Sequence, residues 1–433
     1  MIRRLMTAFA ACAACLWSDS VYAQNSSLVD QMRRLFEDAV VIARTPGGGG
    51  VVAHTPVFLS DPTVVSATSL IDQVSRQIGS QVSIFPLGSS SGGFTYGFDA
   101  ALGTFNRTTE TFGPAFAERA ATLGKGKFSF GMNFLHTKYD SIDGHNLEEG
   151  DIKFNLLHQP IGSYVEGDVI QAALKMKLTS NTAVFFVNYG ATDRLDIGLA
   201  VPIVHIAMDL TYHATILDFS TRVSSPSTHL FANGGKTQDF SSSGSASGIG
   251  DIVVRGKYRL TNVPNGGTAI GADLRLPSGD ENNMLGTGAT QARLFFIGSG
   301  GRGKTNAHVN VGYTVSGSGS YDQVNYIGGV EYAASPKVTV VGDLLGRTLR
   351  GAVRVTDVSI PHSFQQGPTA PVEQTTLQSV ALTPGTVSSP LGTGGVKINP
   401  NSNLLISAHV LFPLNGSGLK SGITPVIGFE YSF

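Results

Sequence analysis

The sequence predicts an all-β protein: a transmembrane, antiparallel β-barrel of about twelve strands (fourteen is the alternative count) after a mixed, partly helical N-terminal region. Three observations carry this prediction. The N-terminus has the features of a secretory signal, and no later run of about 18 apolar residues could form a membrane-spanning helix. From Lys127 onward, apolar and polar residues alternate with a period of two, which is typical of strands.

Residues 1–23 have the three parts of a cleavable signal peptide. Two arginines stand near the start, residues 5–17 are apolar but too short to cross a bilayer, and small residues at 21–23 suit a signal peptidase. We expect the mature chain to begin at Gln24. Both cysteines then leave with the signal, so the mature chain needs no disulfide. The alternative, a lipid anchor on Cys15, fits poorly because no leucine stands three positions before it.

Composition narrows the class of protein further. The chain has 53 Gly among 433 residues, 14% charged residues and a net charge of -1 at pH 7. A nucleic-acid binder needs a basic surface, so we expect no nucleic-acid partner. A weakly charged, glycine-rich, exported chain is either a large soluble β-protein or a membrane barrel. The periodicity favours a barrel in the outer membrane of a Gram-negative bacterium, with outer-membrane lipid as a partner.

Residues 24–126 form a separate region, which we expect to act as a hatch or as a periplasmic region. A helix is predicted after a cap at Ser26 or Ser27. Its apolar face comprises Leu28, Met32, Leu35, Ala39 and Ile42. A second short helix is predicted around Leu70, Val74 and Ile78. Aromatic side chains of this region could receive an apolar solute or simply pack inside the barrel; they are Phe85, Phe94, Tyr96, Phe98, Phe105, Phe112 and Phe116.

Residues 127–433 are predicted to form the barrel. In 422–433, one face carries Ile423, Pro425, Ile427, Phe429, Tyr431 and Phe433, and the other Thr424, Gly428, Glu430 and Ser432. In 251–260, apolar side chains alternate with three basic ones and an aspartate. A basic face opposite an unbroken apolar face suits a wall between lipid and a polar lumen better than the core of a sandwich.

The predicted strands lie near 127–139, 169–190, 194–212, 249–260, 268–277, 290–298, 306–316, 322–333, 337–354, 391–398, 403–412 and 422–433. Their connections alternate between short and long, the longest being 140–168, 213–248 and 355–390, as expected for periplasmic turns and external loops. The two longest, 169–190 and 194–212, far exceed the roughly 9–11 residues that cross a bilayer. They should project above the membrane or contain a bulge near Ser180-Asn181-Thr182, where the alternation slips.

The lumen-facing positions carry five acidic and five basic residues: Asp251, Arg255, Lys257, Arg259, Asp273, Arg275, Arg293, Glu331, Asp343 and Glu430. They could be charge pairs that merely fill a polar lumen, or a constriction that orients a passing solute. Equal numbers argue against strong ion selectivity. The basic residues of 251–260 and 270–276 could still form a local positive patch.

Several segments resemble a family of proteobacterial outer-membrane proteins described as transporters of the meta-pathway of phenol degradation. These segments are SGGFTYGFDAALGTFNRTTETFGPAFAERA (91–120), YGATDRLDIGLAVPIV (189–204), SGIGDIVVRGKYRL (247–260), LPSGDENNMLGTGA (276–289) and VLFPLNGSGLKSGITPVIGFEYSF (410–433). The resemblance implies an outer-membrane barrel that passes aromatic or other hydrophobic compounds. The terminal Phe433 also resembles the C-terminal aromatic signal read by the outer-membrane assembly machinery, which would make that machinery a partner.

Other chemistries find little support. The histidines show no metal-ligand spacing, although His205, His213 and His229 fall near one loop. His362-Ser363 has no recognisable third partner for hydrolysis. We therefore expect no catalytic, metal or cofactor site. The leading hypothesis is a channel for passive uptake of small hydrophobic or aromatic solutes. The alternatives are a plugged structural or adhesive barrel and, with less support, an outer-membrane hydrolase.

Overall fold

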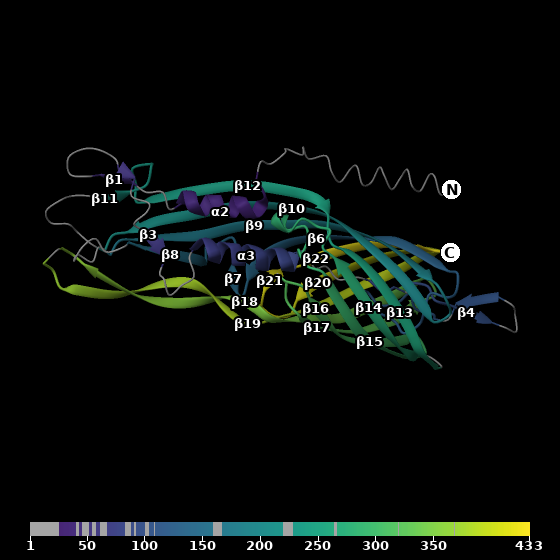
Figure 1. Ribbon diagram of the computed structural model, residues 1–433. Coiled ribbons are helices and arrows are strands. Elements are labelled where there is room, and N and C mark those ends of the chain that lie inside the picture. Colours follow the sequence, from purple (N-terminus) through teal and green to yellow (C-terminus); the bar gives the residue numbers. More distant parts are fainter. Residues whose placement is uncertain are drawn as a thin grey trace.

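The computed structural model describes residues 26–39, 43–45, 52–53, 58–60, 67–82, 88–90, 92–99, 104–107, 109–158, 167–219, 228–263, 266–318, 320–367 and 369–433. The predicted signal peptide 1–23, Ile42 of the first predicted helix and Phe85 lie outside these residues. Figure 1 shows a cylinder of tilted strands, which continues on one side into a narrower part formed by the longest strands. We call this narrower part the extension.

Twelve antiparallel strands close the barrel, as predicted. They are β6 (Phe128–Ile142), β9 (Val169–Gly190), β10 (Leu195–Leu217), β13 (Ile252–Val263), β14 (Gly266–Leu276), β15 (Gln291–Arg302), β16 (Thr305–Ser316), β17 (Gln323–Ser335), β18 (Val338–Gln365), β19 (Val372–Asn401), β20 (Leu404–Pro413) and β22 (Thr424–Ser432). The last strand closes the cylinder on the first, in a register that runs from Leu135 opposite Val426 to Ser129 opposite Ser432. Closure leaves no strand edge whose amides hydrocarbon would have to satisfy.

The two ends of the barrel differ. Turns of a few residues join β9 to β10, β15 to β16, β17 to β18 and β19 to β20 at the end where the chain terminates. The longer connections lie at the opposite end, with the extension. Barrels of this type place short turns in the periplasm and long connections outside. We therefore call the end with the C-terminus periplasmic and the other end external.

Successive side chains of the wall alternate between outside and inside. In β13, Tyr258 is 42% exposed on the outer face while the neighbouring Lys257 is fully buried inside. The outward apolar positions recur around the cylinder, as at Ile270, Leu294, Phe296, Val311, Val330, Leu344 and Ile427. An apolar outer band over a polar interior is the distribution that a barrel in lipid requires.

The alternation reverses where the barrel becomes the extension. In β10, Ile197 and Leu199 point outward, but farther along the same strand Ile206 and Leu210 point inward and are buried. The pairing of β9 with β10 runs from Val169 to Gly190 without a shift, so the bulge considered near residues 180–182 is absent. Apolar residues change face because the strands leave the lipid and then enclose a water-excluding core.

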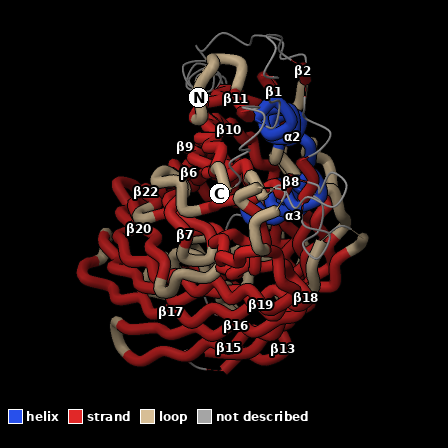
Figure 2. Tube along the Cα trace, turned by 90° about the vertical axis from the view of Figure 1, so that its left-hand side faces the viewer, coloured by secondary structure: helices blue, strands red, loops and turns tan. Residues whose placement is uncertain are grey.

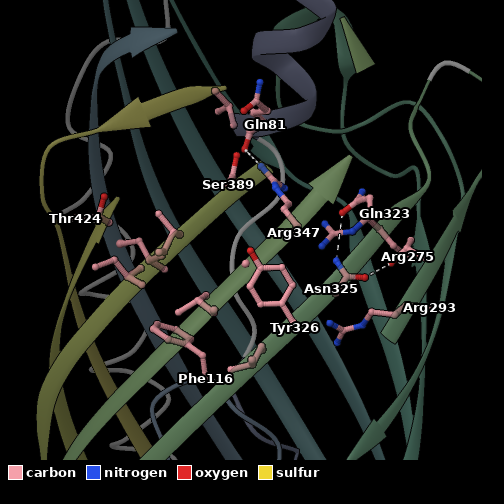
Figure 3. A pocket seen from close by; sticks show the side chains of 18 of the residues that line it. Gln81, Phe116, Arg275, Arg293, Gln323, Asn325, Tyr326, Arg347, Ser389 and Thr424 are labelled. Carbon is pink, nitrogen blue, oxygen red and sulfur yellow. Dashed lines mark hydrogen bonds between the residues drawn. The ribbon is translucent and has the colours of Figure 1, made fainter. Parts of the chain in front are cut away.

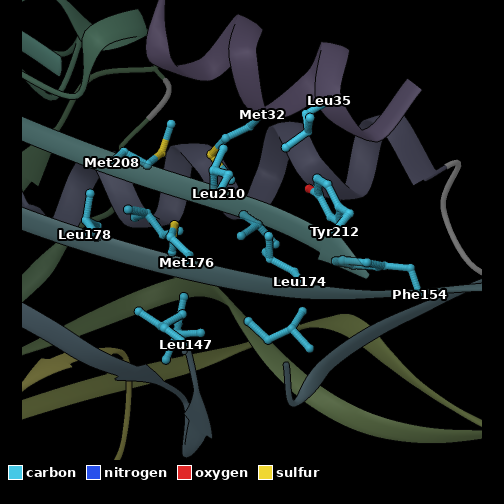
Figure 4. Close-up of a cluster of buried hydrophobic side chains, with 14 of the residues drawn as sticks. Met32, Leu35, Leu147, Phe154, Leu174, Met176, Leu178, Met208, Leu210 and Tyr212 are labelled. Carbon is cyan, nitrogen blue, oxygen red and sulfur yellow. The ribbon is translucent and has the colours of Figure 1, made fainter. Parts of the chain in front are cut away.

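Both predicted helices lie in the extension. Helix α2 (Leu28–Ala39) begins after Ser27, whose Oγ accepts a hydrogen bond from Asp30 N at 3.1 Å, and helix α3 is Ala67–Val82. The predicted residues that pack inward from them are Leu28, Met32, Leu35, Val74 and Ile78. Figure 4 shows Met32 and Leu35 of α2 above Met208, Leu210 and Tyr212 of β10. Figure 2 shows both helices on one side of the extension.

Long strands occupy much of two predicted external loops. Strand β12 (Thr237–Ile249) lies within the predicted loop 213–248 and pairs with β10. The predicted loop 355–390 is largely the hairpin of β18 and β19, paired from Val338 opposite Ile398 to Gln365 opposite Val372. Both predictions were wrong because they treated these segments as loops outside the bilayer. Outside lipid a strand still forms wherever a neighbouring strand satisfies its backbone N–H and C=O groups, and the extension supplies such neighbours.

Shorter elements complete the described chain. One small sheet joins β11 (Thr228–Leu230), β1 (Ala43–Thr45) and β2 (Val52–Ala53), and β4 (Tyr96–Asp99) pairs with β5 (Thr104–Arg107). At the external side lie β3 (Phe58–Ser60), β7 (His145–Asn146), β8 (Ile152–His158), β21 (Leu419–Ser421) and the 3-10 helix η2 (Glu281–Asn283). No helix of the described residues is long and apolar enough to cross a membrane.

Candidate functional site

The barrel lumen is occupied by chain that precedes the first wall strand. We call residues 88–90, 92–95 and 109–124 the plug; the β4–β5 hairpin between its two parts projects from the periplasmic end (Figure 1). Phe94 and Phe112 of the plug meet edge to face with centroids 5.7 Å apart, and both pack on Leu405 of the wall. Phe116 packs among apolar wall residues. Three predicted aromatic residues thus fill the lumen.

Carboxylates of the wall accept hydrogen bonds from backbone N–H groups of the plug. Gly93 N donates to both oxygens of Glu430 at 2.8 and 2.9 Å. Phe116 N and Ala117 N donate to one oxygen of Asp343 at 2.6 and 3.0 Å. Bonds to a charged acceptor are stronger than neutral ones, so each carboxylate fixes the height of the plug in the barrel.

Two lysines of the wall donate hydrogen bonds to backbone carbonyl oxygens of the plug. Lys257 Nζ donates to the carbonyl oxygens of Arg119 and Ala121 at 3.1 and 2.8 Å, and it lies 3.2 Å from the carboxylate of Asp196. Lys397 Nζ donates to the carbonyl oxygen of Pro114 at 2.6 Å. Lys257 is fully buried. The polar lumen that the sequence predicts is therefore filled here by atoms of the plug.

A charge network joins the plug to the wall near the middle of the lumen. Arg255 donates to Glu118 of the plug at 2.5 Å and to both oxygens of Asp273 at 2.6 and 2.9 Å. Arg293 also pairs with Asp273. Glu118 further accepts hydrogen bonds from Ser90 N at 2.6 Å and from the Ser89 and Ser90 hydroxyls. The two carboxylates are thus fully engaged by these neighbours.

Most of the predicted lumen residues lie inside the barrel, and two lie toward its ends. Those inside the barrel are Arg255, Lys257, Asp273, Arg275, Arg293, Glu331, Asp343 and Glu430. Asp251 and Arg259 lie toward the two ends of the barrel, although Asp251 still acts electrostatically on Arg275. Asp251 directly precedes β13 and accepts hydrogen bonds from Gly279 N and Thr287 N of an external connection. Arg259 donates to the carbonyl oxygen of Asp193 at the periplasmic turn.

Sequence analysis missed several residues that hold the plug. Asp196 accepts hydrogen bonds from Leu123 N at 3.1 Å, Asn310 from Glu118 N at 2.6 Å and Thr339 from Phe112 N at 3.0 Å. All lie at inward positions of predicted strands. Asn310 and Thr339 were missed because only charged residues were selected, whereas Asp196 was overlooked although it is charged. Selecting every polar residue at an inward-facing strand position, charged or not, would have found them.

Above the plug lies a cavity of about 240 Å³ inside the barrel. Figure 3 shows Gln81, Ser389 and Arg347 at one end of it, Phe116 of the plug at the other, and Tyr326 between them. Its apolar lining comprises Phe116, Leu135, Val253, Phe295, Tyr326, Ile327, Leu345, Leu391 and Leu411. Its cationic lining comprises Arg255, Arg275, Arg293, Arg347 and Lys420. An apolar chamber with a few convergent polar groups is the usual form of a small-molecule site.

A serine–histidine–glutamate chain lies lower in the barrel. Ser299 Oγ is 2.9 Å from His308 Nδ1, and His308 Nε2 is 3.0 Å from Glu331. Ser299 Oγ also accepts a hydrogen bond from Ala120 N of the plug. The serine is therefore a plug contact. Among the described residues, no group of three or more His, Cys, Asp or Glu side chains is placed to hold a metal ion.

Residues 162–370 match the family described as "Putative MetA-pathway of phenol degradation". The family resemblance is confirmed. The predicted segments 91–120 and 410–433 lie outside this match. The comparison with curated proteins gives no match.

Solved structures of outer-membrane proteins are similar to this chain at low sequence identity. An outer-membrane channel from Pseudomonas putida F1 is 15% identical, with a TM-score of 0.41, over 72% of this chain and 98% of that one. The toluene transporter of Ralstonia pickettii is 17% identical, with a TM-score of 0.29, over 80% and 98%. A FadL homologue from Pseudomonas aeruginosa is 10% identical, with a TM-score of 0.31, over 71% and 89%. The barrel assignment itself rests on the strand pairing above.

Proposed function

We propose that this protein is an outer-membrane channel for passive uptake of small hydrophobic or aromatic molecules, and that the plug acts as its hatch. The observation that carries the proposal is the cavity of about 240 Å³ inside the barrel, with the plug as its floor. A cavity of about 150 Å³ is enough to bind benzene. The chamber therefore suits a single-ring solute. The description of the family, phenol degradation, points to the same chemical class.

The plug is held in a way that permits movement. Its contacts to the wall are noncovalent: hydrogen bonds and ion pairs, as at Glu430, Asp343 and Lys257, and apolar packing, as at Leu405. The chain after residue 23 has no cysteine that could tie the plug covalently. The solute would enter the cavity from the external side and leave when the plug shifts. If the same contacts were permanent, the protein would be a closed structural or adhesive barrel. Transport of a solute distinguishes a channel from such a barrel.

Uptake by whole cells tests the proposal. Gram-negative cells that carry the chain in the outer membrane would take up labelled toluene at low concentration, with empty-vector cells and a labelled disaccharide as controls. The proposal predicts faster toluene uptake and unchanged disaccharide uptake in cells with the chain. Equal toluene uptake with and without the chain would contradict transport and support a closed structural barrel.

Placement in the membrane belongs to the same proposal. Cleavage after Ala23, partnership with outer-membrane lipid and recognition of Phe433 by the assembly machinery are parts of it. Phe433 pairs with Phe128 through two backbone hydrogen bonds of 3.0 Å, and their rings stack 5.9 Å apart at the closing seam. The proposal assigns no catalytic activity, since the plug occupies Ser299.

A further inference from the structure

Two cationic side chains at the external end of the cavity lack an acidic partner among the described residues. Lys420, in the external connection between β20 and β22, is 5% exposed, and its Nζ has no hydrogen-bond partner there. Arg347 of β18 donates only a long hydrogen bond of 3.4 Å from Nη2 to Gln81 O, and its buried Nη1 has no partner there. Both side chains line the cavity. Burying a cation without a partner is costly, so such a pair points to a ligand.

The carboxylate that acts on Lys420, Asp143, forms no ion pair with either cation among the described residues and is bound by other groups. Asp143 accepts hydrogen bonds from Gly418 N at 2.8 Å and Val355 N at 2.9 Å, and it lies 3.5 Å from Arg354 Nε. The other titratable groups that act on Arg347 are Arg275, a second cation, and Tyr139. The carboxylates that line the cavity, Glu118 and Asp273, are engaged by other arginines. The external end of the cavity is therefore positively charged.

The opposite end of the cavity is apolar and aromatic. Phe116 forms the floor, and Phe295 and Tyr326 stand in the wall. A ligand that satisfies both ends has one ring and one anionic group. We infer that the cavity binds a single-ring aromatic carboxylate, with its carboxylate on Arg347 and Lys420 and its ring over Phe116. Arginine and lysine together suit a carboxylate, since each supplies charge-assisted hydrogen bonds. This inference rests on the proposed function and narrows its substrate class.

Calorimetric titration of the purified full-length protein with benzoate tests the inference, with benzyl alcohol as the neutral analogue. Wild type should bind benzoate at least about tenfold more tightly than benzyl alcohol. The Arg347→Gln and Lys420→Gln variants should each bind benzoate about 10- to 100-fold more weakly, with benzyl alcohol unchanged. Arg350→Gln is the matched control, because Arg350 lies on the same strand with an exposed side chain. It should bind benzoate like wild type.

The outcomes separate this inference from the proposed function. Benzoate that binds no better than benzyl alcohol would overturn the inference, as would both variants keeping affinities within about twofold of wild type. If Arg347→Gln fails to fold, Lys420→Gln decides, since Lys420 lies in the short strand β21 and not in one of the twelve long wall strands. Failed toluene uptake with benzoate binding intact would contradict the channel alone. Toluene uptake without benzoate binding would contradict the carboxylate site alone.

Discussion

Truncation of Asp343 should loosen the plug. In the closed state, one oxygen of Asp343 accepts hydrogen bonds from Phe116 N and Ala117 N at 2.6 and 3.0 Å. Asp343→Ala would leave these two buried N–H groups without an acceptor, and each costs roughly 1–3 kcal/mol. At the lower end, about 2 kcal/mol would raise the ratio of open to closed barrels about 30-fold.

Single-channel recording in planar bilayers measures this ratio. Asp343→Ala should open far more often than wild type, with each opening of similar conductance. The control is Asp357→Ala, which removes a carboxylate of the same strand that is 78% exposed in the extension. Equal open probabilities for wild type and both variants would refute the idea that these hydrogen bonds hold a movable plug.

Three further predictions concern the wall, the seam and the cavity. Val311→Arg, at the middle of β16 on the exposed outer face, should lower the free energy of unfolding in lipid vesicles by about 2–4 kcal/mol, against about 0–1 for Thr305→Arg at the periplasmic end of the strand. Similar costs at both sites would argue against a lipid band there. Deletion of Phe433 should reduce the amount of assembled barrel in the outer membrane, because Phe433 closes the seam with Phe128; wild-type levels would contradict that role. Burial, and next the nearby arginine, lower the pKa of Lys420 to about 8, so its charge is present below that pH and lost above it. Benzoate affinity measured from pH 7 to pH 9 should therefore fall, and a flat profile would show that this ammonium does not bind it.

The positions of the barrel strands were readable from sequence because lipid and lumen impose opposite polarities on alternate residues. Tyr258 and Lys257 differ in polarity, and the structure places them on opposite faces. The slip near residues 180–182 was also readable, but its cause was not. A bulge and a change of surroundings produce the same slip, and only the unbroken β9–β10 pairing distinguishes them.

The candidate site was less predictable, because hydrogen bonds between the plug and the wall depend on tertiary placement. The alternation of the strand places Lys257 inside the barrel. It cannot predict whether the ammonium group binds water or, as here, the carbonyl oxygens of Arg119 and Ala121. The cationic end of the cavity joins Arg347 of β18 to Lys420 of an external connection. The sequence separates these residues widely and assigned the second to a loop, so nothing in the pattern linked them.

A reversible covalent lock on the plug tests the channel most directly. A Cβ placed on Gly329 of β17 would lie 3.2 Å from Cβ of Ala117 in the plug, close to the separation of about 3.5–4.5 Å in a disulfide. The only nearer groups are the side-chain atoms of Asp343, at 2.5 and 3.1 Å, so Gly329→Cys alone is the control for crowding. In the cell uptake assay, the oxidised Ala117→Cys, Gly329→Cys pair should lose toluene uptake and regain it after reduction, with the single variant unaffected by either treatment. Uptake at the wild-type rate by the oxidised pair would contradict a plug that moves to open the barrel.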